Sequence, residues 1–203
     1  MKFRAKFIYL ISPNKINHNF YKNLELVLKT NKVKYFQLRL KKTRREKILM
    51  ISQKIIKICK KHRVKFIIND DPTIARKAGA DGCHLGQSDM NIQKARKILK
   101  KGIIGITCNN SIKKAKEAIK NKADYIAVGA FNPSKTKKVK YKAKISDLKK
   151  IRKLSNTSLI AIGGINQYNY RKLLLNKADF LAISSFVWKN KKFKPLEAIK
   201  ILK

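Results

Sequence analysis

The sequence predicts an α/β protein that folds as a single (β/α)8 TIM barrel, one domain spanning residues 1–203. Three features lead to this prediction: eight short apolar runs, the amphipathic segments between them, and a weak internal repeat. Strands that alternate with helices form a parallel sheet, and eight such strands close into a barrel. At 203 residues the chain is at the small end of this fold's range, which begins at about 200 residues.

The apolar runs have the length and composition of buried strands. Most are rich in isoleucine, valine, phenylalanine or tyrosine, the residue types that favour strands. Between them, segments such as 45–62 and 91–101 carry apolar residues at three- and four-residue steps, the period of an α-helix. The predicted strands are residues 7–11, 35–40, 65–69, 82–87, 103–107, 125–130, 159–164 and 180–185.

The internal repeat reads GADGCHLG, KADYIAVG and KADFLAIS. In each copy an aspartate, Asp81, Asp124 or Asp179, stands just before a predicted strand. In a barrel this position lies on the N-terminal face, where residues serve stability rather than chemistry. We therefore predict that these three aspartates are turn residues.

The chain is strongly basic, with 51 lysines and arginines against 11 acidic residues and a formal net charge of +40. Such a charge raises nucleic acid as a partner. The lysines, however, run from Lys2 to Lys203 without forming one patch, and no nucleic-acid-binding motif is visible. Helical stretches such as SIKKAKEAIKNK should carry them on outer, solvated faces. The sequence therefore predicts no specific nucleic-acid partner.

Cysteine use and hydropathy bear on the compartment. The three cysteines, Cys59, Cys83 and Cys108, form no CxxC pair, which supports neither a disulfide framework nor a zinc site. A reducing cytoplasm is the simplest setting. No apolar run is long enough to span a bilayer, and FIYLIS near the start is too short for a signal peptide. We predict a cytoplasmic protein without a membrane partner; the sequence does not decide between a monomer and a homo-oligomer.

Four of the 11 acidic residues fall within residues 66–90. Asp81 belongs to the repeat, and Asp71 directly precedes Pro72, a common position for a helix-capping aspartate. Asp70 and Asp89 instead follow two neighbouring strands, at the carboxyl ends where barrel enzymes keep their active sites. Two carboxylates there predict a site for a hard cation such as Mg2+.

Other strand ends carry groups that suit an anionic ligand. Period-two alternation directs Gln37, Arg39 and Lys41 toward the barrel mouth, where a buried cation needs an anionic partner. Thr107 ends a strand, although the polar residues behind it would equally serve as a helix cap. Groups suited to phosphate follow the last three strands: Ser134, Thr136 and Lys137 in the longest connection, Gly163–Gly164, and Ser184–Ser185.

Taken together, these motifs resemble those of the thiamine phosphate synthase family. The stretches QLRLK, Asn69–Asp70, DGCHLGQSD, SKTK and AIGGI follow one another in the family's order and cover nearly the whole chain. The resemblance implies a (β/α)8 barrel. It also implies a transferase that joins 4-amino-2-methyl-5-(diphosphooxymethyl)pyrimidine to a thiazole phosphate, releasing pyrophosphate and forming thiamine phosphate.

The resemblance also implies a role for each site residue. Asp70 and Asp89 would bind the Mg2+ cofactor. Arg39, Lys41 and Lys137 would stabilise the leaving pyrophosphate, and this ionisation needs no general base. The pyrimidine diphosphate would contact Gln37, Arg39, Lys41, Asn69, Thr107 and Lys137, and the thiazole phosphate would contact Ser134, Thr136, Gly164, Ile183 and Ser184.

Two residues stand apart from this assignment. Where the family commonly has an arginine after Asn-Asp, this chain has Asp71, which either recruits a second cation or caps its helix. His84 alternates with Cys83 and Leu85 and therefore points inward. We predict that His84 is a hydrogen-bonded core histidine.

Two other functions are weighed against the synthase. A thiazole tautomerase, an isomerase on the same barrel, should not need the diphosphate-binding residues, so Arg39, Lys41 and Lys137 favour the synthase. The more remote alternative is a lysine-rich nucleic-acid-binding protein. Binding that disappears in moderate salt would count against that alternative.

Overall fold

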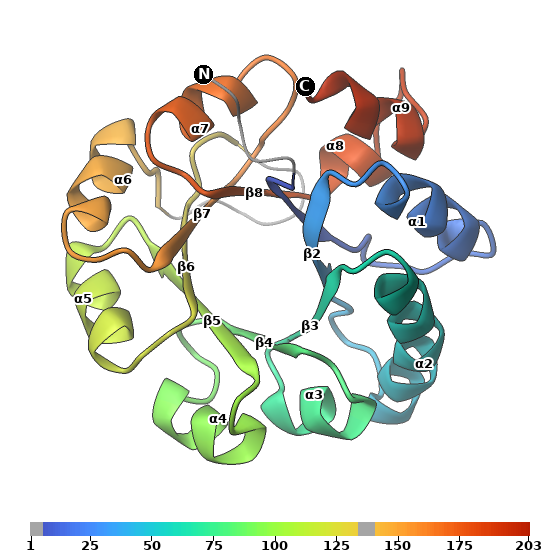
Figure 1. The fold of residues 1–203 in the computed structure, drawn as a ribbon, viewed down its shortest axis with the longest axis horizontal. Helices are drawn as coiled ribbons and strands as arrows, with labels where there is room; N and C mark the ends of the chain where they lie inside the picture. The colour runs from blue at the N-terminus through green and yellow to red at the C-terminus, as the bar shows by residue number, and fades with distance from the viewer. Residues whose placement is uncertain (1–5, 134–140) are drawn as a thin grey trace.

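A computed structural model of the chain describes residues 6–133 and 141–203. Within these ranges eight strands pair in chain order, each parallel to the next, and β8 pairs with β1 to close the barrel (Figure 1). The predicted single TIM barrel is therefore confirmed. The strands are β1 (Ile8–Ile11), β2 (Val33–Leu38), β3 (Lys65–Asn69), β4 (Gly82–Leu85), β5 (Ile103–Asn109), β6 (Tyr125–Gly129), β7 (Ser158–Ile162) and β8 (Phe180–Ile183).

The helices form a ring outside the strands (Figure 1). A helix follows each strand along the chain, and β8 is followed by two. No helix of the described residues is long and apolar enough to cross a lipid bilayer. The helices are α1 (Phe20–Leu28), α2 (Arg45–Lys61), α3 (Pro72–Ala78), α4 (Ile92–Leu99), α5 (Ile112–Lys120), α6 (Ile145–Arg152), α7 (Tyr170–Leu175), α8 (Ser185–Trp188) and α9 (Pro195–Ile201).

The apolar residues form two separate cores because successive side chains of a strand point to opposite faces. On β1, Ile8 and Leu10 belong to the outer core between strands and helices. Tyr9 and Ile11 belong to the inner core that fills the barrel. The inner core is small and aromatic, and it also includes Tyr125 of β6 and Phe180 of β8. A closed barrel of this size has a packed interior, so a ligand site can form only at one of its ends.

The strand ends differ in detail from the sequence prediction. β2 begins at Val33, two residues earlier than predicted, and β5 continues to Asn109 through an irregularity in its pairing with β6. β4 ends at Leu85, where a turn begins in which the Asp89 carboxylate accepts a hydrogen bond from the Gly86 N–H at 2.6 Å. Ser185 begins α8 rather than ending β8. Local side-chain-to-backbone hydrogen bonds, which apolar periodicity does not encode, set such boundaries.

The repeated aspartates lie on the N-terminal face, as predicted, and each links two strands. The Asp81 carboxylate accepts a hydrogen bond from the Phe66 N–H at the start of β3, at 2.8 Å. Asp124 does the same for Ile104 in β5 at 2.8 Å, and Asp179 for Leu159 in β7 at 2.9 Å. Each carboxylate also pairs with a basic side chain, namely Lys65, Arg96 and Arg152 in turn.

We expect Asp124→Ala to lower the free energy of unfolding by about 1–3 kcal/mol, since it leaves the Ile104 N–H without its acceptor. Steady-state activity at 25 °C should remain normal because Asp124 is at the end of the barrel opposite the cavity described below. Urea denaturation of both variants checks the first expectation. Glu117→Ala, which removes an exposed carboxylate from α5, is the control and should change stability by less than about 0.5 kcal/mol. Equal effects of the two substitutions would contradict the proposed strand-linking role.

Candidate active site

One cavity opens at the carboxyl ends of the strands and has a volume of about 520 Å3. Its size is within the usual range for small-molecule sites, about 300–1,000 Å3. The carboxyl-terminal rim is also where barrel enzymes bind their substrates. Every strand contributes at least one lining residue: Ile11, Gln37, Asn69, His84, Thr107, Gly129, Ile162 and Ala182.

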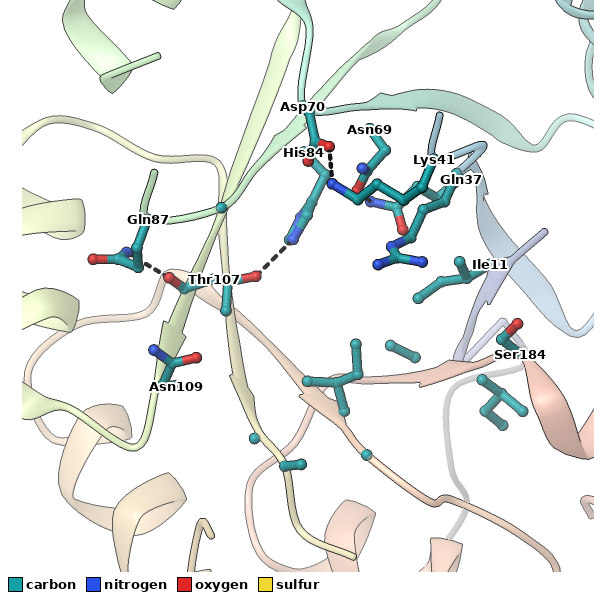
Figure 2. Close-up of a pocket in the computed structure, with 18 of the residues that line it drawn as sticks. Ile11, Gln37, Lys41, Asn69, Asp70, His84, Gln87, Thr107, Asn109 and Ser184 are labelled. Carbon is teal, nitrogen blue, oxygen red and sulfur yellow. Dashed lines mark hydrogen bonds and ion pairs between the residues drawn. The ribbon is translucent and has the colours of Figure 1, made fainter. Parts of the chain in front are cut away.

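The predicted site residues that the structure describes all line this cavity. They come from strand ends far apart in the sequence and meet because the barrel closes (Figure 2). Ser134, Thr136 and Lys137 lie outside the described residues. The cavity-lining members of the predicted set are Gln37, Arg39, Lys41, Asn69, Asp70, Asp89, Thr107, Gly164, Ile183 and Ser184.

The end of β2 shows the predicted alternation. Leu38 is buried in the outer core, whereas Gln37 is buried on the cavity side and donates from Nε2 to the Asn69 Oδ1 at 3.3 Å. The Arg39 N–H donates to the Ser12 hydroxyl at 2.9 Å, which ties the β2 end to the β1 end. Arg39 and Lys41 therefore reach the cavity from a fixed backbone.

Asp70 and Asp89 lie together at the ends of β3 and β4. The Asp70 N–H donates to the His84 carbonyl at 2.7 Å, with a φ of 69° at Asp70, and its carboxylate forms an ion pair with Lys41 (Figure 2). Burial raises the pKa of the Asp89 carboxyl, and interaction with the Asp70 side chain raises it further. Two carboxylates that repel one another in this way favour a bound cation.

Asp71 points away from the cavity. Its carboxylate accepts hydrogen bonds from the N–H groups of Thr73 at 2.9 Å and Ile74 at 3.0 Å, which caps α3 as predicted. The same carboxylate forms a 3.0 Å ion pair with Arg45 of α2. The negative charge of Asp71 is therefore balanced by the Arg45 guanidinium of the neighbouring helix α2, and it does not face the cavity.

His84 is buried and hydrogen-bonded, as predicted, and it also reaches the cavity floor. Its Nε2 lies 2.8 Å from the Thr107 hydroxyl (Figure 2). Its Nδ1 lies 2.9 Å from the Tyr125 hydroxyl. The imidazole stacks on the Tyr125 ring with centroids 5.6 Å apart. Burial lowers the pKa of His84 to about 4, so the ring is neutral near pH 7.

Several lining residues were missed in the sequence. Ser12 directly follows the first apolar run, so the strand-end rule that identified Asp70 could have found it. Lys114 was expected on an outer face, but it sits in the first turn of α5 and lines the cavity. Lys114 could not be recognised because nothing in the sequence distinguishes it from the solvated lysines around it. Gln87 also lines the cavity and donates from Nε2 to the Thr107 carbonyl at 2.6 Å.

Comparison with known proteins identifies the family. A family model described as thiamine monophosphate synthase matches residues 8–187. The chain belongs to the thiamine monophosphate synthase family. It is 61% identical over 203 residues to a thiamine-phosphate synthase of Pelagibacter ubique strain HTCC1062, covering 100% of this chain and 98% of that protein. A thiamine-phosphate synthase of Fusobacterium nucleatum is 43% identical over 165 residues, covering 80% of this chain and 79% of its own.

Solved structures agree with this family membership. A thiamine phosphate pyrophosphorylase from Pyrococcus furiosus superposes with a TM-score of 0.86 at 26% identity, covering 98% of this chain and 94% of its own. The sequence-based prediction of a transferase of the thiamine phosphate synthase family is confirmed. The tautomerase and the nucleic-acid-binding protein are not favoured, since these relatives are named as synthases or pyrophosphorylases.

The packing of Tyr125 beneath this family's site can be tested at Gly105. A Cβ atom at Gly105 would overlap the Tyr125 ring, which closes the barrel below His84. We expect Gly105→Ala to cost about 1–3 kcal/mol of stability, as overpacked cores do. In a Tyr125→Leu background the same substitution should cost less, because the smaller side chain leaves room for the methyl group. Urea denaturation of the four proteins measures this coupling. Strictly additive effects would show that the close approach does not matter.

Proposed function

We propose that this protein condenses 4-amino-2-methyl-5-(diphosphooxymethyl)pyrimidine with a thiazole phosphate, giving thiamine phosphate and pyrophosphate. One observation carries the proposal beyond family membership: basic side chains and a pair of carboxylates share the rim of one cavity. Arg39, Lys41, Asp70 and Asp89 all line it. This combination suits a ligand that carries a diphosphate, whose charge needs both cationic side chains and a metal ion.

The pyrimidine diphosphate would lie over β2, β3 and β5. Gln37 and Asn69, hydrogen-bonded to one another, and Thr107 offer polar groups at the cavity floor for the pyrimidine ring. Arg39 and Lys41 line the rim above them and would contact the diphosphate. We assign Lys137 to the same group from the family resemblance; it lies outside the described residues.

Asp70 and Asp89 fit a magnesium site. Both are carboxylates, they lie close enough for Asp70 to raise the pKa of Asp89, and oxygen donors of this kind are the ligands Mg2+ prefers. In the described residues Asp70 also forms an ion pair with Lys41, a cation on the rim of the same cavity. When bound, Mg2+ would neutralise part of the negative charge of the diphosphate.

The protein's contribution to the reaction would be stabilisation of a leaving group. The bond between the pyrimidine methylene carbon and the diphosphate oxygen breaks, and the electron pair leaves with pyrophosphate. Arg39, Lys41 and Lys137 would stabilise this developing charge. The thiazole nitrogen then forms a bond to the methylene cation, so no proton has to be removed in these steps and no general base is assigned.

The thiazole phosphate would bind on the β7–β8 side of the cavity. Gly164, Ile183 and Ser184 line the cavity there. Gly164 has a φ of 55°, and a Cβ at this position would come within 2.7 Å of the Asn132 Cβ, so glycine is needed where two loops meet. We assign Ser134 and Thr136, outside the described residues, to the same phosphate.

We further propose a single domain over residues 1–203 that acts in a reducing compartment such as the cytoplasm. Its partners would be the two small-molecule substrates, with no specific nucleic acid. Either a monomer or a homo-oligomer is compatible with this activity.

Pyrophosphate release from the purified protein tests the proposed activity. We expect release only when both substrates and Mg2+ are present, because the leaving group and its acceptor must share the cavity. A tautomerase would release none under any condition. Release without the thiazole phosphate would indicate hydrolysis and would contradict the proposed transfer.

We expect Asp89→Ala and Lys137→Ala each to lower kcat/KM by at least about 100-fold, since the first would remove a ligand of Mg2+ and the second a cation that stabilises the leaving diphosphate. Circular dichroism should show that both variants are folded. Asp71→Asn, which keeps the cap of α3, and Lys142→Ala, an exposed lysine of the same connection as Lys137, are the matched controls. Near-normal turnover in either test variant would remove that residue from the proposed site.

A further inference from the structure

A chain of hydrogen bonds runs from the closed interior of the barrel to the cavity. The hydroxyls of Tyr9 and Tyr125 lie 2.7 Å apart. The Tyr125 hydroxyl lies 2.9 Å from His84 Nδ1, and His84 Nε2 lies 2.8 Å from the Thr107 hydroxyl. Tyr9, Tyr125 and His84 are buried, and Thr107 lines the cavity. The four groups come from β1, β6, β4 and β5, so the chain depends on closure of the barrel.

The direction of this chain follows from counting donors and acceptors. The Tyr9 hydroxyl has one hydrogen-bond partner in the described part of the protein, the Tyr125 hydroxyl. If Tyr9 only accepted, its own proton would be buried without an acceptor, which is unfavourable. Tyr9 therefore donates to Tyr125. By the same reasoning the Tyr125 proton has one remaining acceptor, His84 Nδ1, and Tyr125 donates to it.

The imidazole of His84 completes the sequence of donors. Both of its ring nitrogens face hydroxyl groups rather than a carboxylate, and the ring is buried; burial disfavours a doubly protonated ring and outweighs the attraction of the nearby Asp70 carboxylate. A neutral imidazole carries one N–H. Because Nδ1 accepts from Tyr125, the N–H is on Nε2 and donates to the Thr107 oxygen. The Thr107 proton is then left to point into the cavity.

We infer that Tyr125, supported by Tyr9, is a positioning residue that fixes the His84 tautomer and thereby presents the Thr107 hydroxyl to the cavity as a hydrogen-bond donor. The matching ligand group is an acceptor, such as an aromatic ring nitrogen. With the opposite tautomer, Thr107 would donate to His84 and turn its lone pairs toward the ligand. Assigning the acceptor to the pyrimidine rests on the proposed function; the tautomer itself does not.

Two further contacts hold the ends of this chain in place. The Thr107 carbonyl accepts a hydrogen bond from Gln87 Nε2 at 2.6 Å, which fixes the backbone next to the hydroxyl. At the other end, the Tyr9 and Tyr125 rings pack edge to face with centroids 5.5 Å apart. The donation from Tyr9 also polarises the Tyr125 hydroxyl and makes it a better donor to His84. The row of hydrogen bonds is therefore held in place at both of its ends, at the cavity and in the barrel interior.

The tautomer can be measured without any substrate. In protein labelled with 15N-histidine, long-range 1H–15N correlation spectra distinguish a protonated from an unprotonated ring nitrogen for each of the three histidines. His84 is assigned by the signal lost in His84→Gln. We expect a protonated Nε2 and an unprotonated Nδ1 for His84 at pH 7. A protonated Nδ1, or an averaged signal in the wild-type protein, would overturn the inference even if the enzyme is an active synthase.

Substitutions test whether Tyr125 is responsible. Tyr125→Phe keeps the ring but removes the donor to Nδ1, so we expect a mixture of His84 tautomers. We also expect a KM for the pyrimidine diphosphate raised about five- to tenfold, with a smaller change in kcat, since the diphosphate contacts are unchanged. Thr107→Val should raise this KM by a similar factor, whereas Thr107→Ser, which keeps the hydroxyl, should have the KM of the wild-type protein. An unchanged tautomer and KM in Tyr125→Phe would overturn the inference.

A matched control separates positioning from general loss of a buried hydroxyl. Tyr170 is also buried, and its hydroxyl donates to the Lys203 carbonyl at 2.7 Å, away from the cavity. Tyr170→Phe should lose comparable stability yet leave both the His84 tautomer and the KM unchanged. If Tyr125→Phe proves unfolded, the wild-type spectrum and the Thr107 pair still decide the question. Failure of the condensation assay with a normal spectrum would count against the proposed function and not against the tautomer.

Discussion

Parallel pairing of all eight strands, closed by β8 on β1, places the carboxyl end of every strand at one rim. Residues as distant in sequence as Ile11, Thr107 and Ser184 line one cavity for this reason. The opposite rim is stabilised by the repeated aspartates, which link successive strands through backbone N–H groups. One rim of the barrel therefore holds the aspartates that link strands, and the other holds the cavity. The cavity forms only when the sheet is closed.

The electrostatics of the site differ from those of the surface around it. A protein with a formal net charge of +40 would be expected to collect anions anywhere. Only at the ends of β3 and β4, among the described residues lining the cavity, do carboxylates lie among the cations, as Asp70 and Asp89 beside Lys41. This mixture is what the proposed site for a metal and a diphosphate requires, and general attraction of anions to basic side chains would not need the carboxylates. Below it the neutral Tyr9–Tyr125–His84 chain supplies directional hydrogen bonding where charge would be costly.

Much of this could be predicted from the sequence, because its signals are local. Apolar periodicity located the strands, and period-two alternation placed Gln37 and Leu38 on opposite faces, as observed. The cap role of Asp71 followed from its position before Pro72. The carboxyl ends of the predicted strands identified Asp70 and Asp89, and the family resemblance added Asn69 and Ile183; the individual roles of these residues stay predictions.

Other features could not be predicted because they depend on contacts between distant strands. Nothing local links Tyr9 to Tyr125, which lie 116 positions apart and meet only when the barrel closes. The position of Lys114 on the cavity depends on where α5 begins, which is set by the Ser111 cap and the extension of β5 to Asn109. The ion pair of Arg45 with Asp71 likewise requires α2 and α3 to be neighbours.

The claim that a carboxylate-bound metal and the basic rim together hold a diphosphate is tested most directly by calorimetric titration of the protein with inorganic pyrophosphate. We expect binding in the presence of Mg2+ that weakens at least about tenfold when the metal is removed with a chelator. Asp89→Asn should reduce the affinity in Mg2+ to the metal-free value. Equal affinity with and without metal, falling only as salt is raised, would show general attraction to a basic surface and would contradict the account.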